Sequence, residues 1–331
     1  MPRFIPGLTL SELFYNDIVE PLLAAHYPHL KYSAGLLGPG SEVLGYDTPQ
    51  STDHHWGPRL LLFLSDSDFH RAQNIIWTML SEKLPYMFQG YSVNFGKPDR
   101  FGVQLLHEIT CGPVNHRVEI VTVKSFFKEH LNINPYQELT SSNWLSFSEH
   151  KLLEVTQGKI FHDDLNLEEI RKKFIYYPRD IWLFLLSRQW NRISQEEAFM
   201  GRCGAVGDEL GSKILTARLV EHLMKLCFLM ERVYSPYSKW FGTAFMTLKS
   251  SNTLAPIFTE VLRAQSWKKR ENYLCQAYTE IAILHNKLGI TKPMETQVSP
   301  FYNRPYLIIH ARDFSEEIKK FIADEKLKYT S

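Results

Sequence analysis

The sequence lacks any continuous apolar run of the roughly 18 residues that a membrane-spanning helix requires. Its start, MPRFIPGLTLSELF, has no positively charged segment followed by an apolar one, so we expect a cytoplasmic protein without membrane partners. Cysteine is scarce, and the four that occur form no Cys-x-x-Cys pair. This spacing disfavours both a zinc knuckle and a disulfide framework.

An excess of charge of one sign is also missing. The 37 Lys and Arg residues face 36 Asp and Glu residues, which leaves a formal net charge of +1. No general attraction to nucleic acid or to an anionic membrane is therefore expected. With 331 residues, 44% of them hydrophobic, the chain can bury the core of one large domain or of two ordinary ones.

The hydrophobic pattern changes character near residue 140. Before it, short β-like runs alternate with helical patterns, and the runs lie at 30–37, 58–64, 91–95 and 116–123. After it the helical period dominates, most clearly at 207–234, where Leu219, Leu223 and Leu226 fall on one stripe with Leu215 and Met230. The sequence therefore predicts an α+β protein, with a mixed sheet and helices at 1–140 and a helical bundle at 141–331.

The stretch GPGSEVLGYDTPQSTDHHWGPRLLLFL, at 38–64, has the residues of a phosphate site. A Gly-Ser turn after a strand presents backbone N–H groups and a hydroxyl to phosphate oxygens, so we predict that Gly40 and Ser41 bind a nucleotide. Asp53 comes shortly before the next strand, where a carboxylate suits Mg²⁺, and Glu119 lies in the apolar run VEIV as a second strand acid. Arg59 begins the strand and is placed to meet a phosphate.

Gly40, Ser41, Gly45, Ser51 and Asp53, followed by the apolar run 60–64, resemble the signature of the DNA polymerase beta-type nucleotidyltransferase superfamily, which includes the aminoglycoside nucleotidyltransferases. More closely, the phrases DHHWGPRL, RQWNRI, GRCGAVGDELGS and YSPYSKWFGTAF are similar to an uncharacterised family, a domain of unknown function. That family joins a nucleotidyltransferase-like half to a helical half, and the resemblance covers roughly residues 30–290. It implies a fold and no established substrate.

The resemblance implies transfer of a nucleotidyl group, AMP from ATP in the first place, to a hydroxyl of an unknown small-molecule, protein or RNA acceptor. Superfamily enzymes usually present Asp-x-Asp, whereas this chain has His55 at the position of the second acid. An imidazole suits Zn²⁺ or Mn²⁺ better than Mg²⁺. Three alternatives remain open here: Asp53 and Glu119 hold one metal, His55 joins a different metal site, or the protein binds a nucleotide without catalysis.

The segment GRCGAVGDELGSK, at 201–213, places four glycines in a helical region, where each costs about 1 kcal/mol relative to alanine. Close backbone approach to the other half, to a ligand or between packed helices would offset this cost. Arg202 is a candidate nucleotide contact, as is Lys239 in YSPYSKWFGTAF. In the aminoglycoside enzymes a carboxylate of the helical half activates the acceptor, so the resemblance implies Asp208 or Glu209 as the base. RNA binding by the helical half is a lesser alternative.

Overall fold

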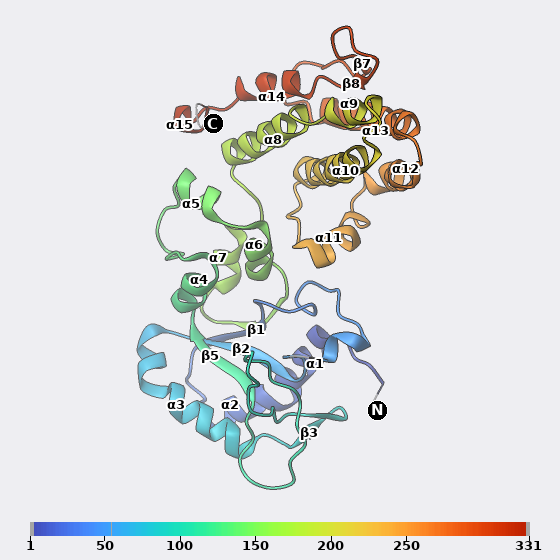
Figure 1. The fold of residues 1–331 in the computed structure, drawn as a ribbon. Coiled ribbons are helices and arrows are strands. Elements are labelled where there is room, and N and C mark those ends of the chain that lie inside the picture. The colour runs from blue at the N-terminus through green and yellow to red at the C-terminus, as the bar shows by residue number, and fades with distance from the viewer. Residues whose placement is uncertain (1–2, 54, 329–331) are drawn as a thin grey trace. The chain divides into compact units, whose positions relative to one another are not determined.

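The computed structural model describes residues 3–53 and 55–328, apart from the side chain of Asp53. The chain divides into two compact units, Met1–Ile175 and Tyr176–Ser331. The expected α+β class is confirmed, because the first unit contains a mixed four-stranded sheet and the second is built mainly of helices (Figure 1). The division lies further along the chain than residue 140, since the strand at 159–163 adds to the sheet of the first unit.

The sheet has the strand order β5-β2-β1-β6. Its strands are β1 (Tyr32–Leu36), β2 (Arg59–Leu64), β5 (Arg117–Thr122) and β6 (Lys159–Asp163). β1 runs antiparallel to β2 and β6, while β2 runs parallel to β5. The carboxyl end of β1 and the amino ends of β2 and β5 therefore meet at one end of the sheet, which we call the glycine edge.

Both faces of β2 are covered, which explains its uninterrupted apolar sequence. Leu60, Leu62 and Leu64 belong to the core that also contains residues of the helices α1 and α3. Phe63 points to the opposite face, where its ring meets Phe126 of α4 at 5.4 Å. The helices of this unit are α1 (Gly7–Phe14), α2 (Glu20–His26), α3 (Asp66–Lys83), α4 (Val123–Leu131), α5 (Ser141–Ser146), α6 (Glu149–Thr156) and α7 (Leu167–Lys172).

Not every expected strand forms at full length. The run at 91–95 contributes only β4 (Tyr91–Ser92), which pairs with β3 (Met87–Phe88) outside the main sheet. β6 takes the place beside β1, with Ala34 opposite His162. Its burial is only partial, so its sequence lacks the apolar run that marks β1 and β2.

The second unit packs its helices around the long helix α10 (Glu209–Glu231), where Leu219, Leu223 and Leu226 are fully buried as the stripe predicted (Figure 1). Its other elements are α8 (Arg179–Ser194), α9 (Phe199–Ala205), α11 (Ser238–Phe245), α12 (Ser251–Arg263), α13 (Trp267–Lys287), β7 (Ser299–Pro300), β8 (Leu307–Ile308), α14 (Ala311–Lys319) and α15 (Glu325–Lys328). Within residues 3–53 and 55–328, no helix combines the length and apolar character needed to cross a bilayer.

A buried carboxylate holds the start of α14. Glu197, between α8 and α9, accepts hydrogen bonds from the amides of Ile309 at 3.1 Å and Ala311 at 3.2 Å. Burial raises the pKa of Glu197 to about 7, although these two amide hydrogen bonds act in the opposite direction. The protonated side chain therefore persists to a higher pH in the folded protein than in the unfolded chain.

We expect the Glu197→Gln variant to gain stability relative to the wild type as the pH rises from 5 to 8. The folded pKa of Glu197 lies above the ordinary value of 4.5, so the stability of the wild type falls as the pH rises between these two values. At about 1.4 kcal/mol per pKa unit the relative gain amounts to a few kcal/mol. Urea denaturation at pH 5 and pH 8 measures it, with the exposed Glu316→Gln as the control. Equal pH dependence in both variants would contradict the prediction.

Candidate functional site

A tight turn follows β1 at the glycine edge. Gly38 and Gly40 have φ angles of +91° and +145°, a region that side chains rarely adopt. The amide of Tyr46 donates to the carbonyl of Ser41 at 2.8 Å and closes the turn. The amides of Ser41 and Glu42 donate to no other residue that the structure describes. The predicted nucleotide residues Gly40 and Ser41 thus lie in a turn whose first N–H groups are available to an acceptor.

A buried ion pair, Arg59 with Glu42, packs against this turn. The Arg59 Nε and Nη2 atoms donate to Oε1 of Glu42 at 2.9 and 2.6 Å, and Nη2 also donates to the carbonyl of Pro39 at 2.8 Å. A Cβ atom at Gly40 would lie only 2.6 Å from Glu42 Oε2 and 2.7 Å from Arg59 Nη2. Arg59 therefore connects the turn to the start of β2, and its contact with a nucleotide stays a prediction.

The segment between the turn and β2 is anchored by Trp56. Its buried indole donates to Oδ2 of Asp47 at 3.1 Å, and the same oxygen accepts from the amide of Gly7 at 2.7 Å. The segment includes a short 3-10 helix, Pro49–Asp53. The Asp53 side chain, which was predicted to bind metal, lies outside the described residues.

The structure brings His55 and Glu119 to the same residue, Arg117. The Arg117 Nη1 atom is hydrogen-bonded to Nδ1 of His55, and Nη2 donates to Oε1 of Glu119 at 2.5 Å. The cause is the parallel register of β2 and β5, which sets Arg59 opposite Arg117 and Leu61 opposite Glu119. Sequence reasoning missed Arg117, although its place two residues before Glu119 puts both side chains on one face of a strand.

These groups alone do not make a metal centre. Among the described residues, no three His, Cys, Asp or Glu side chains lie close enough to share an ion. Glu119 is 46% exposed and paired with Arg117, so it is one accessible carboxylate. Mg²⁺ often takes one or two carboxylates and completes its shell with phosphates and water, so the pairing of Glu119 with Asp53 on one ion stays a prediction.

Asp208 and Glu209 have partners within the second unit. Oδ1 of Asp208 accepts from the amide of Gly211 at 2.8 Å and caps α10. Glu209 is ion-paired with the buried Arg270, whose guanidinium also donates to Ser212 Oγ at 2.9 Å. Asp208 thus caps a helix and Glu209 neutralises a buried arginine. That either of them acts as the base stays a prediction.

The two predicted basic contacts of this unit are both exposed. Arg202 lies on α9, and Lys239 lies on α11 with its Nζ atom 5.0 Å from the centre of the Trp240 ring. That Arg202 and Lys239 contact a nucleotide stays a prediction.

Contacts within the second unit explain why glycine stands at four positions of 201–213. A Cβ atom at Gly201 would lie 2.6 Å from Cβ of Tyr306, and one at Gly204 would lie 2.1 Å from Cγ of Trp267. Gly207 has a φ angle of +84° just after α9, as a residue that ends a helix often does. Gly211 is crowded by the Asp208 side chain that caps α10. Helix packing and capping thus account for the glycines.

We expect Gly204→Ala to destabilise the protein by about 1–3 kcal/mol, because the added methyl group would overlap the Trp267 ring. Gly242→Ala is the matched control, since Gly242 lies in α11 with nothing within 4 Å of the added atom. The control should be neutral or stabilising by up to about 1 kcal/mol. Urea denaturation compares the two, and equal stabilities would show that Gly204 is not constrained by packing.

We expect Arg59→Met to destabilise the protein by about 3–5 kcal/mol, because Glu42 would be left as a buried, unpaired charge. Arg71→Met is the control, since Arg71 is 77% exposed and its pair with Asp68 contributes about 1 kcal/mol or less. Thermal and urea unfolding measure both variants. If Arg59→Met keeps full stability and only loses ligand affinity, the ion pair is not what holds the turn.

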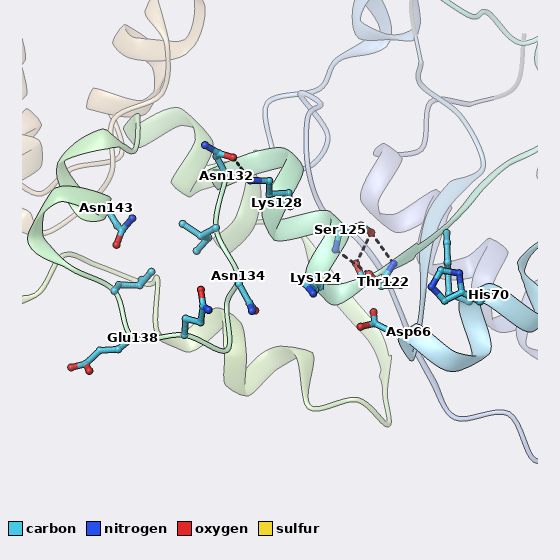
Figure 2. Close-up of a pocket in the computed structure, with 14 residues that line it drawn as sticks. Asp66, His70, Thr122, Lys124, Ser125, Lys128, Asn132, Asn134, Glu138 and Asn143 are labelled. Atoms are coloured by element: carbon cyan, nitrogen blue, oxygen red, sulfur yellow. Dashed lines mark hydrogen bonds between the residues drawn. The ribbon is translucent and has the colours of Figure 1, made fainter.

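A cavity of about 780 Å³ lies at the other end of the sheet from the glycine edge, where β2 and β5 end and α3 and α4 begin. Figure 2 shows polar side chains around it, including Asp66, Lys124 and His70. The carboxyl ends of parallel strands are frequent ligand sites. None of the predicted site residues lines this cavity. We place the candidate site at the glycine edge because the turn after β1 and the starts of β2 and β5, with Glu119, lie at this end of the sheet.

The comparisons with known proteins are sparse. A family described as a domain of unknown function, DUF4037, matches residues 144–241, less than a third of the chain. The phrases RQWNRI and GRCGAVGDELGS fall inside this range, whereas DHHWGPRL lies outside it. No curated protein matches the chain. A nucleotidyltransferase-like protein from Exiguobacterium sibiricum 255-15, known from a crystal structure, aligns with 94% of this chain and 89% of its own at 11% identity and a TM-score of 0.35, too low to carry an argument.

Proposed function

We propose that the protein binds a nucleoside triphosphate, ATP in the first place, at the glycine edge and transfers its nucleotidyl group to a hydroxyl of an acceptor. The observation that carries the proposal is that three segments lie at this end of the sheet. The turn after β1 offers the amides of Ser41 and Glu42, and Arg117 connects His55, from the segment before β2, to Glu119 on β5. Such an arrangement combines donors for phosphate oxygens with a strand carboxylate.

Each group has a role in this proposal. The turn at Gly40 and Ser41 binds phosphate oxygens through the backbone N–H groups of Ser41 and Glu42, and Arg117 holds Glu119 in place on β5. Asp53 and Glu119 would hold Mg²⁺, which when bound offsets the charge that develops on the phosphates. The acceptor oxygen then attacks the α-phosphorus, pyrophosphate leaves, and the hydroxyl proton passes to a base.

The second candidate is a nucleotide-binding or interaction protein without transfer activity. It is favoured by His55, which replaces the usual second acid and is hydrogen-bonded to Arg117. Loss of the second carboxylate would remove one of the groups that bridge two metal ions in phosphoryl transfer. RNA binding by the helical unit has no structural observation in its favour.

A calorimetric titration of ATP with and without Mg²⁺ tests the proposal. We expect Mg²⁺-dependent binding by the wild type, and Asp53→Asn and Glu119→Gln should weaken it by about 10- to 100-fold or more. Their metal-free binding should be kept, because the backbone of the turn is unchanged.

Lys124→Ala is the matched control, since Lys124 lines the cavity at the opposite edge. If this variant alone loses ATP binding, the nucleotide occupies the cavity and the proposed site is wrong. Metal-independent binding that is indifferent to Asp53 and Glu119 would favour the second candidate. Absence of any binding would contradict both.

A further inference from the structure

His130 lies against the glycine-rich turn. It belongs to the last turn of α4, and its Nδ1 atom is 2.9 Å from Oε2 of Glu154 on α6. Both side chains are nearly buried, with 7% and 4% of their surface exposed. The amide of Gly38 donates to the carbonyl of the same Glu154 at 2.8 Å. The turn, the imidazole and the carboxylate therefore form one local assembly.

The Nε2 atom of His130 faces this turn without a partner. A Cβ atom at position 38 would lie 3.5 Å from Nε2 and 3.4 Å from Cε1, so glycine leaves this edge of the ring uncovered. Nε2 makes no hydrogen bond with a described residue. It is also not among the side-chain nitrogens that are buried without a partner, which include those of His222 and His285. Nε2 thus keeps some exposure within a side chain that is 7% exposed as a whole.

Next to this ring, the charges of Glu154 and Lys151 offset each other. Glu154 also accepts from Lys151 Nζ at 2.6 Å, and its second oxygen is 3.4 Å from Nε2 of His150. Burial alone would raise the pKa of Glu154, but the hydrogen bonds from His130 and Lys151 hold it below its usual value. Burial lowers the pKa of His150, which keeps that ring neutral. One carboxylate and one ammonium cancel, so an imidazolium at His130 would make the group cationic.

The hydrogen bond to Glu154 also determines which ring nitrogen of His130 donates and which accepts. A ring that donates Nδ1–H to a carboxylate presents Nε2 as an acceptor, and after taking a proton it presents Nε2–H as a donor. Glu42 and Arg59 lie next to Gly40 of the same turn and are paired with each other. His130 therefore presents Nε2 toward the turn, where a proton on this atom would make it a donor to an anion.

We propose that His130, oriented by Glu154, is a phosphate contact of the glycine-rich turn and takes up a proton as the phosphates of the ligand bind. The inference rests on the proposed function, because it assumes that phosphates occupy the turn. The inference adds His130 of α4 to a site that otherwise consists of the segment 38–64 and residues of β5.

Calorimetry at pH 7.5 in buffers of different ionisation enthalpy tests the inference, with MgATP and magnesium tripolyphosphate as probes. We expect the wild type to take up a substantial fraction of one proton with either probe. His130→Gln should lose this uptake and bind about 10- to 100-fold more weakly, as when a hydrogen bond to a charged group is lost. His150→Gln, which changes the neighbouring ring on the same carboxylate, should retain the proton uptake.

A second measurement needs no variant. In histidine-labelled wild type, nuclear magnetic resonance should show His130 with its proton on Nδ1 and should show protonation of Nε2 upon addition of MgATP. If MgATP binds without this change, and His130→Gln keeps the proton uptake, the inference is wrong while the proposed function stands. If neither probe binds to the wild type, the proposed function fails and this inference with it.

Discussion

The candidate site depends on one buried ion pair, Arg59 with Glu42. Two charges taken from water are tolerated because each satisfies the other and Arg59 also satisfies the carbonyl of Pro39. The pair fastens the turn after β1 to the first residue of β2. Its bulk leaves no room for a side chain at position 40, which is why glycine stands there. The amides of Ser41 and Glu42 are positioned by this contact rather than by the turn alone.

The parallel pairing of β2 and β5 is the second constraint. It brings the segment before β2 beside the start of β5, so that Arg117 reaches His55 and Glu119 together. The same pairing places the starts of α3 and α4 around the cavity at the other end of the sheet. The two ends consequently differ in chemistry: one has glycines, an arginine and an acid, and the other has capped helix starts with side chains of both charges.

The second unit shows how a polar, glycine-rich segment can have a structural cause. Gly204 is required by the ring of Trp267, and Asp208 caps α10, which contributes Leu219, Leu223 and Leu226 to the core of this unit. Glu209 neutralises the buried Arg270. Variants of Asp208 or Glu209 therefore affect stability as well as any chemistry, and both effects have to be measured together.

Local sequence was sufficient to predict β1, β2, β5 and the stripe of α10, because burial on fixed faces imposes a short-range apolar pattern. It also predicted the turn at Gly40, since a glycine before a serine after a strand is a local signal. The tertiary structure alone decided that β6 joins the sheet, that Arg59 faces Glu42 and that Arg117 lies between His55 and Glu119. It likewise decided that Gly204 meets Trp267 and that His130 meets Gly38. Apart from the local contact of Arg117 with Glu119, these contacts join residues far apart in the sequence. Their proximity is set by how strands and helices pack, which no local pattern records.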